Sequence, residues 1–171
     1  MTDGTLDQVD GRPALRFTRR LPHPPERVWR AVTSYDDLAA WFVVPMEFTH
    51  VGQHFEAMEE SGEVLRFEPP RLLAFEWGGE QLSFDLEPDG DGTRLTFVHV
   101  FADRDRGADY ASGWHFHLGR LDGHLVGTTL PEEDPAELVA LNDAYSERFG
   151  LDREVGRRVI AQYYGTQETR G

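Results

Sequence analysis

The most distinctive pattern in the chain is an apolar stripe at helical spacing within residues 110–128. The stripe consists of Tyr110, Trp114, Leu118, Leu121 and Leu125, with His117 at its edge. We therefore predict one long helix over this segment. Its opposite side carries Phe116, Gly119, Gly123 and Gly127. Because each glycine inside a helix costs about 1 kcal/mol relative to alanine, we expect another element to pack closely against that side.

Upstream of this helix, short runs that alternate between apolar and polar residues predict an antiparallel sheet. The expected strands are 13–21, 45–49, 53–59, 63–68, 71–77, 81–87 and 93–101. Glycine, proline and aspartate separate the runs, which is typical of a meander with tight turns. In the last strand, His99 falls on the same side as Phe97 and Phe101, and we assign that side to the interior.

Helices are expected at both ends of this sheet region. Two short ones are predicted at 26–33 and 35–42. Near the C-terminus, a helix capped by Asp134 should end at Gly150, and a last helix should carry the apolar stripe Val155, Val159 and Tyr163. These two helices need a surface to cover. The glycine side of the long helix is our candidate, and a dimer partner is the alternative.

The charge of the chain argues against several classes of partner. Among 171 residues, seventeen are basic and thirty-one acidic, so the net charge of -14 repels phosphate backbones and anionic lipids. We therefore expect no nucleic-acid partner. We also expect no membrane insertion, because no apolar run approaches the roughly 18 residues that span a bilayer. All basic residues are arginine, which removes Schiff-base chemistry and the P-loop lysine.

Cysteine is absent, which excludes disulfides, thiolate nucleophiles and thiolate metal sites. The first residues lack the basic and apolar regions of a signal peptide, so we expect a cytoplasmic protein. Residues 1–12 are polar and acidic, and we expect them to form a flexible tail.

Five sequence words, in this order along the chain, resemble those of the SRPBCC or START-like superfamily. They are Pro-Pro-Glu-Arg-Val-Trp-Arg-Ala-Val (24–32), Leu-Ala-Ala-Trp-Phe (38–42), Pro-Pro-Arg-Leu-Leu-Ala-Phe-Glu-Trp (69–77), Gly-Thr-Arg-Leu-Thr-Phe-Val-His (92–99) and Gly-Trp-His-Phe-His-Leu-Gly-Arg-Leu (113–121). The chain is most similar to the bacterial group related to the activator of heat shock protein 90 ATPase. The resemblance covers residues 13–128.

The resemblance implies an α+β helix-grip fold, in which a seven-stranded curved antiparallel sheet wraps around the long helix. We accordingly divide the chain into a tail (1–12), a helix-grip domain (13–130) and a helical C-terminal extension (131–171). The superfamily includes lipid and hormone binders, polyketide cyclases and chaperone activators. Its eukaryotic chaperone activators carry a separate chaperone-binding domain for which this chain has no room, so we do not expect chaperone stimulation.

Two histidines, His99 and His117, are the candidate polar residues of an interior pocket. They are either structural histidines bonded to backbone or carboxylate groups, or polar contacts to a ligand together with Tyr110. In the polyketide-cyclase relatives such a histidine could serve as an acid or base, which is a third interpretation. Further candidate ligand contacts, taken from interior positions and superfamily geometry, are Trp41, Phe75, Phe84, Phe97, Trp114, Leu118 and Leu121.

The other histidines do not predict a metal site. His115 and His117 are two residues apart on a helix, and His50 and His54 straddle an expected turn, so neither pair has the i, i+4 helical spacing of zinc enzymes. No Gly-x-Ser-x-Gly word supports a hydrolase, and the carboxylate runs are typical of solvated loops. We therefore expect no metal, no cofactor and no assigned catalytic residue.

The leading hypothesis is a non-enzymatic binding protein for a small hydrophobic or amphipathic molecule, acting as a monomer or homodimer. The first alternative is a cyclase or aromatase that uses one of the two histidines. The second is a protein-interaction module, chaperone-activator-like or regulatory, whose C-terminal extension docks a partner.

Overall fold

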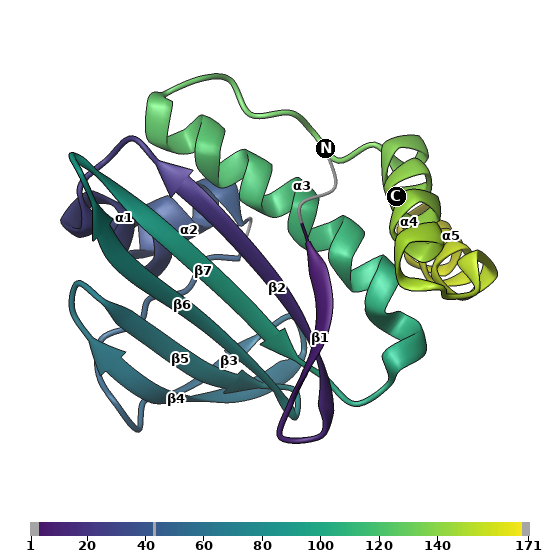
Figure 1. Ribbon diagram of the computed structural model, residues 1–171, viewed down its shortest axis with the longest axis horizontal. Helices are drawn as coiled ribbons and strands as arrows, with labels where there is room; N and C mark the ends of the chain where they lie inside the picture. The colour runs from purple at the N-terminus through teal and green to yellow at the C-terminus, as the bar shows by residue number, and fades with distance from the viewer. Residues whose placement is uncertain (1–3, 43, 169–171) are drawn as a thin grey trace.

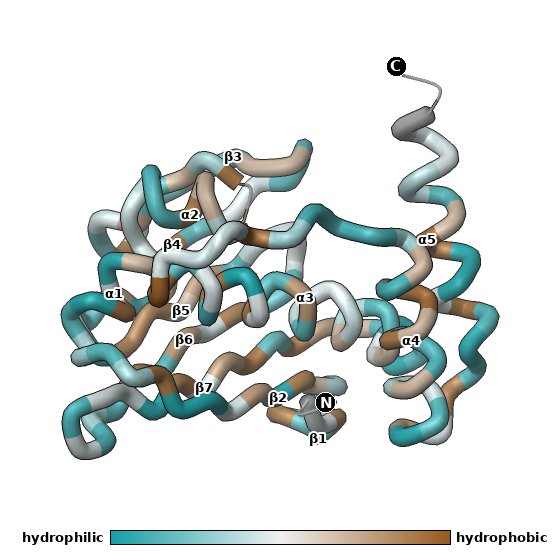
Figure 2. Tube along the Cα trace, turned by 90° about the horizontal axis from the view of Figure 1, so that it is seen from above, coloured by the Kyte–Doolittle hydropathy of each residue, from teal (hydrophilic) through white to brown (hydrophobic). Residues whose placement is uncertain are grey.

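A computed structural model describes residues 4–42 and 44–168 of the protein. One antiparallel sheet of seven strands has the order β1-β2-β7-β6-β5-β4-β3 (Figure 1). The strands are β1 (Thr5–Val9), β2 (Arg12–Leu21), β3 (His54–Ala57), β4 (Glu60–Glu68), β5 (Leu72–Trp77), β6 (Glu80–Asp89) and β7 (Gly92–Val100). Apolar and polar segments alternate along these strands, as Figure 2 shows by hydropathy.

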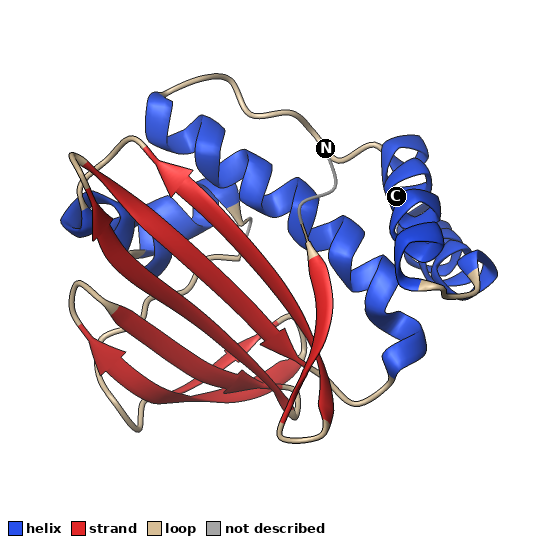
Figure 3. Cartoon of the chain, in the orientation of Figure 1, coloured by secondary structure: helices blue, strands red, loops and turns tan. Residues whose placement is uncertain are grey.

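The helices lie on one side of this sheet and at its ends (Figure 3). They are α1 (Pro25–Thr33), α2 (Tyr35–Trp41), α3 (Gly107–Val126), α4 (Pro135–Phe149) and α5 (Arg153–Glu168), with a 3-10 turn at Arg104–Arg106. The long helix α3 lies across the sheet, α1 and α2 pack at one end of it, and α4 and α5 pack against α3 toward the other (Figure 1). The α+β helix-grip architecture predicted from the sequence is confirmed. No described helix combines the length and apolar character needed to cross a lipid bilayer.

The stripe on α3 faces the sheet as predicted. Trp114, Leu118, Leu121 and Leu125 are all buried there. They pack against the inward side chains of β6 and β7, including Phe84 and Phe97, which the alternating pattern also assigned to the interior. The core of the domain is this contact between one helix face and one sheet face.

The prediction of a flexible tail at 1–12 is wrong for the described part of that segment. Residues Thr5–Val9 form β1, which pairs with the start of β2. Asp10 and Gly11 make the two-residue turn between them, and both have positive φ, as this type of hairpin requires. The Asp-Gly signal was present in the sequence, but the strand before it is short and mostly polar.

The strand predicted at 45–49 is also wrong. Met46 and Phe48 are buried, so the alternation reflects real burial of an extended segment. Its backbone meets a helix end instead of a strand, since the Phe48 amide donates to the Thr33 carbonyl at 2.9 Å. Burial alternates in both situations, and only the neighbouring element distinguishes them.

The glycine side of α3 is covered only in part. A Cβ at Gly123 would lie 2.9 Å from Leu130 and Thr128, so the chain leaving the helix packs closely there. A Cβ at Gly119 would meet nothing within 4 Å, which contradicts the expected close packing at that position. Gly127 ends the helix in the left-handed conformation.

The extension contributes to the core through α4. Tyr145 is fully buried, accepts a hydrogen bond from the Gly4 amide and contacts His115 Nδ1 at 3.0 Å. The last helix, α5, is buried at Gly156 and Ile160, whereas Tyr163 of the predicted stripe is exposed. The observed buried stripe of α5 is therefore offset by one residue from the predicted one, because α5 approaches α4 most closely at Gly156.

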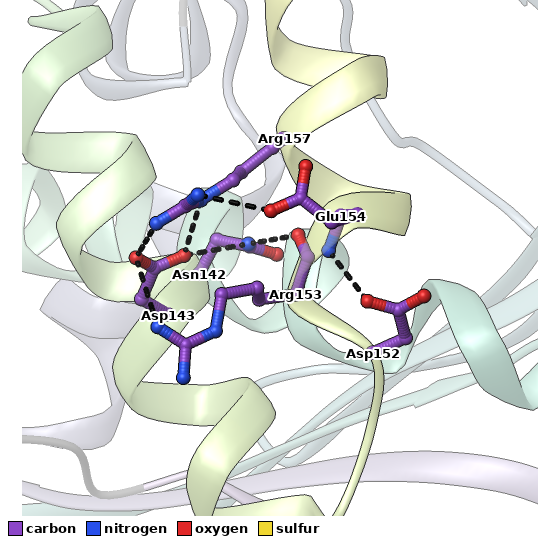
Figure 4. A network of polar contacts seen from close by, with 6 residues as sticks. All are labelled: Asn142, Asp143, Asp152, Arg153, Glu154 and Arg157. Carbon is purple, nitrogen blue, oxygen red and sulfur yellow. Dashed lines mark hydrogen bonds and ion pairs between the residues drawn. The ribbon is translucent and has the colours of Figure 1, made fainter.

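Polar contacts join α4 to α5 next to that glycine (Figure 4). Arg157 donates to both carboxylate oxygens of Asp143, and Asn142 donates to the Arg153 carbonyl at 3.0 Å. Asn142 is completely buried, and a Cβ at Gly156 would lie only 1.8 Å from its Oδ1. The two helices can meet at this distance only because residue 156 has no side chain.

A buried carboxylate joins α2 to the end of α3. Asp37 has a side chain that is only 7% exposed, and it accepts hydrogen bonds from Ser34, from His124 of α3 and from Arg27. Burial raises the pKa of Asp37, but the bonds from Ser34 and His124 and the charge of Arg27 outweigh it and hold the pKa below its ordinary value. The ionised form therefore stabilises the fold.

We predict that Asp37→Asn lowers the free energy of unfolding at pH 7 by about 1–3 kcal/mol, because bonds to a charged acceptor are lost. Since the folded pKa is depressed, this contribution is present above the unfolded pKa of about 3.9 and disappears as the pH falls below it. Urea unfolding of both proteins from pH 7 to pH 3 measures the difference. The exposed neighbour Asp36→Asn is the control, and an equal loss in both variants would contradict the role of Asp37.

We also predict that Gly156→Ala destabilises the protein, because the new methyl group would overlap buried Asn142. Gly165→Ala, in the same helix but with nothing within 4 Å of the added Cβ, should instead stabilise it by up to about 1 kcal/mol. Thermal unfolding of the two variants gives the comparison. A stabilised Gly156→Ala protein would show that α4 and α5 do not pack as described.

Candidate functional site

A pocket of about 220 Å³ lies between the first half of α3 and the ends of strands β5 to β7. Its lining residues come from six separate segments of the chain. They are Phe42, Met58, Trp77, Glu80, Leu82, His99, Asp109, Tyr110, Gly113, Trp114 and His117. The sequence prediction for His99, Tyr110, Trp114 and His117 thus concerned residues that the fold brings together around one opening.

Strand register and helix spacing position the polar side chains of this pocket. On β6, Glu80 occupies the same side as Leu82, two residues further on, and Leu82 pairs directly with His99 of β7. Tyr110 and Trp114 lie one helical turn apart on α3 and face these strand ends. A carboxylate and an imidazole are therefore presented by the sheet to a phenol and an indole on the helix.

Hydrogen bonds link these four side chains in series. Trp114 Nε1 donates to His99 Nδ1 at 3.1 Å, and His99 Nε2 lies 2.6 Å from Glu80 Oε2. An indole nitrogen can only donate, so His99 Nδ1 must be the acceptor and the ring hydrogen must sit on Nε2. This arrangement is that of a neutral His99 donating to Glu80.

Glu80 is an ionised acceptor in this arrangement. The Tyr110 hydroxyl donates to its Oε1 at 2.9 Å, so both carboxylate oxygens receive a hydrogen bond. Burial raises the pKa of Glu80, but the bonds from His99 and Tyr110 outweigh it and keep the pKa below its ordinary value. Burial and the nearby Glu80 charge raise the pKa of Tyr110, so the phenol stays protonated.

A second carboxylate at the pocket is neutralised locally. Asp109 accepts two hydrogen bonds from Arg106, at 2.8 and 2.7 Å, in the bidentate geometry that favours this pair. The Arg106 guanidinium also lies 4.6 Å from the centre of the Tyr110 ring. Arg106 therefore bonds to Asp109 and covers Tyr110, and its charge also helps to lower the pKa of Glu80, although Glu80 forms no direct ion pair with an arginine among the described residues.

Aromatic rings form the remaining walls. Phe42 stacks on Trp114 with 5.5 Å between ring centres and meets the edge of Trp77 at 6.1 Å. Trp77 donates to the Ala57 carbonyl at 3.1 Å, which fixes the end of β3 beside the pocket. The next residue, Met58, has positive φ in the turn to β4 and is 62% exposed at the pocket rim.

His117 differs from His99 in its surroundings. Its Nδ1 is buried and has no hydrogen-bond partner, and its ring meets Phe42 and Trp114 edge-on. Burial, with a further contribution from the Arg120 charge, lowers the pKa of His117 to about 4. The imidazole is therefore neutral at pH 7 and offers an unused nitrogen.

Arg120 holds the α2 end of the pocket in place. Its Nε donates to the Trp41 carbonyl at 2.9 Å and its Nη2 to the Ala40 carbonyl at 2.8 Å, at the C-terminal end of α2. A cation at this end of a helix is favourable, because the last carbonyls lack intrahelical partners. The contact positions Phe42, which follows directly in the chain.

The other predicted ligand contacts fill the core. Six side chains, buried and outside the pocket lining, are Trp41, Phe75, Phe84, Phe97, Leu118 and Leu121. The centre of the Phe97 ring lies 4.3 Å from the ring centre of Trp114 and 5.0 Å from that of Phe84. Aromatic rings therefore occupy the space between α3 and the middle of the sheet. The open volume is displaced to one end of the interior.

Sequence reasoning missed seven residues of the pocket, which are Phe42, Met58, Trp77, Glu80, Leu82, Asp109 and Gly113. Glu80 could have been found, since extending the alternation of Leu82, Phe84 and Leu86 by one step places it on the inner face. The strand boundary at 81 excluded it. The other positions depend on how a hairpin and a helix end meet the sheet, which no local pattern encodes.

The described residues contain no group of three or more histidine and carboxylate side chains placed to hold a metal ion. His115, one of the histidines considered for a metal, contacts the Tyr145 hydroxyl on the side of α3 that faces α4. A separate, wider groove of about 770 Å³ runs between α3 and α4 past Phe116, Gly119 and Leu141.

The chain was compared with known families, curated proteins and solved structures. A family model described as activator of Hsp90 ATPase homolog 1-like protein matches residues 22–126. No protein with a curated description matches the chain.

Three solved structures illustrate the likeness of fold. A conserved protein of unknown function from Enterococcus faecalis has a TM-score of 0.72 at 19% identity, covering 85% of this chain and 89% of its own. For CalU16 from Micromonospora echinospora the TM-score is 0.69 at 23% identity, with coverage of 84% and 94%. A protein encoded by gene BPP1335 of Bordetella parapertussis reaches 0.66 at 28% identity, with coverage of 88% and 93%.

We predict that His117 titrates far below the usual pKa of histidine, near pH 4, when its ring carbon shifts are followed by NMR. The unfolded chain binds a proton at about pH 6.5 and the folded chain does not, so stability should fall as the pH drops from about 6.5 to 4. His117→Phe should lack this part of the loss. A His117 that titrates near pH 6.5 would contradict its described burial.

Proposed function

This chain belongs to the family of activator of Hsp90 ATPase homolog 1-like proteins, and from that premise we propose that it is a non-enzymatic binding protein. It would hold one small hydrophobic or amphipathic molecule in the pocket between α3 and the ends of β5 to β7. The observation that carries this proposal is an opening of about 220 Å³ with aromatic walls, which the imidazole rings of His99 and His117 also line.

The volume of the pocket sets the size of the molecule. A cavity of about 150 Å³ is enough for benzene, whereas sites for drug-sized ligands measure about 300–1,000 Å³. At about 220 Å³, this pocket fits a single ring with a short substituent. Long-chain lipids and multi-ring polyketides exceed it, so we propose a monocyclic or similarly compact ligand.

The two histidines would have different roles in this function. Both nitrogens of His99 are engaged, one with Trp114 and the other with Glu80, so His99 orients groups around the pocket. His117 lines the pocket, and its Nδ1 has no hydrogen-bond partner but is fully buried. In the cyclase-like alternative, His117 would accordingly be the base. We favour binding because the other proton-transfer groups of the pocket, Glu80, His99 and Tyr110, are already hydrogen-bonded to one another.

The C-terminal extension supports a structural role more than a docking role. Tyr145 is buried against α3 and the start of β1, and the family match ends at residue 126, before α4 begins. We propose that α4 and α5 are an addition to the helix-grip domain and that α4 has become part of its core. The interaction-module alternative would then depend on the exposed faces of α4 and α5.

We predict that benzylamine and benzyl alcohol, used as single-ring probes, shift the Trp114 indole N–H resonance in a saturable way. Gly113→Leu should abolish the shifts, because Gly113 lines the pocket and an added Cβ meets nothing within 4 Å. Gly119→Leu is the matched control, since that glycine is equally unhindered but lines the α3–α4 groove. Both changes favour the helix by about 1 kcal/mol, so neither should unfold the protein.

Two outcomes would overturn this proposal. One is the absence of saturable shifts with every probe in the wild-type protein. The other is binding that survives Gly113→Leu and is lost in Gly119→Leu, which would move the site to the outer groove.

A further inference from the structure

The charge of the pocket specifies the ligand further than its shape does. Four ionisable groups other than tyrosine face it, from β6, β7 and α3, and they are Glu80, His99, Asp109 and His117. Asp109 is paired with Arg106, and both imidazoles are neutral by the arguments above. Glu80 and Asp109 therefore share the charge of Arg106, which pairs with Asp109, so these three described side chains carry one negative charge in excess.

Buried carboxylates in folded proteins are normally paired with a cation, because removing a charge from water is costly. Glu80 lies in a pocket and its side chain is only 27% exposed. Its hydrogen bonds come from a phenol and a neutral imidazole, which stabilise the charge without cancelling it. A cation arriving from outside would complete this arrangement.

The walls of the pocket suit a cation as well. Phe42, Trp77 and Trp114 line the opening, and aromatic faces attract ammonium groups through their ring quadrupoles. The Arg106 guanidinium already uses the Tyr110 ring in this way, at 4.6 Å. The net charge of -14 would also attract cations toward the protein and repel anions.

From this juxtaposition of an excess negative charge with three aromatic walls, we propose that the ligand of the pocket is a small organic cation, such as a protonated amine with one ring. The inference rests on the proposed function, because it assigns a ligand class to the same site. The ammonium group lies toward Glu80, and the apolar part contacts Phe42, Trp77 and Trp114.

Benzylamine, which is protonated at pH 7, and benzyl alcohol form a matched pair of nearly equal shape for the test, and benzoate is the anionic member. Dissociation constants are measured by NMR titration at constant ionic strength. We expect benzylammonium to bind the wild-type protein about tenfold more tightly than benzyl alcohol, and benzoate to bind most weakly. Only the benzylammonium affinity should weaken as salt is added.

Glu80→Gln should remove the preference for benzylammonium, because the amide keeps the shape of the side chain and loses its charge. The control is Glu87→Gln, which removes the same charge from an exposed position on the same strand. We expect Glu87→Gln to retain the tenfold preference. Should Glu80→Gln fail to fold, the wild-type preference and its salt dependence still decide the question.

The outcomes separate the two proposals. Equal binding of the amine and the alcohol, or tighter binding of benzoate, would overturn the cation assignment and leave the binding function standing. An undiminished preference in Glu80→Gln would also overturn it. If none of the three probes binds the wild-type protein, both the binding function and the cation assignment fail.

Discussion

The hydrogen bond from the Trp114 indole to His99 determines the chemistry of the whole pocket. An indole cannot accept, so this one contact fixes the tautomer of His99, directs its other nitrogen toward Glu80 and keeps that ring neutral. Each of these hydrogen-bonded side chains has a partner, which is the condition under which buried polar side chains are tolerated. The ionised state of Glu80 follows from contacts that begin on the helix.

The helix α3 separates two different environments. Toward the sheet it carries large apolar side chains together with the polar residues of the pocket, and toward α4 it carries His115, Phe116 and Gly119. Rings such as Phe84 and Phe97 fill the central interior, and the pocket is found at the end where Tyr110 and Trp114 lie. The pocket is therefore small and lies at one end of the fold, with room for about one ring.

Sequence patterns predicted the elements well and the pocket only in part. His99 could be placed in the interior because strand alternation is strict, and the stripe on α3 could be found because helical spacing is regular. Segment 45–49 was wrongly predicted as a strand, since the burial of side chains in an extended segment bonded to the Thr33 carbonyl alternates as it does in a strand. Phe42 and Met58 could not be foreseen, because their positions depend on Arg120 bonding to α2 and on Trp77 bonding to Ala57.

Gly113 bears on how proteins with this pocket diversify over generations. One nucleotide change turns a glycine codon into a codon for alanine or valine, and a Cβ at residue 113 meets nothing within 4 Å. Every such change would improve the helix and shrink the pocket by a small step, without disturbing the core on which folding depends. Inherited substitutions at this single position can therefore change the size of the pocket while the rest of the gene stays constant.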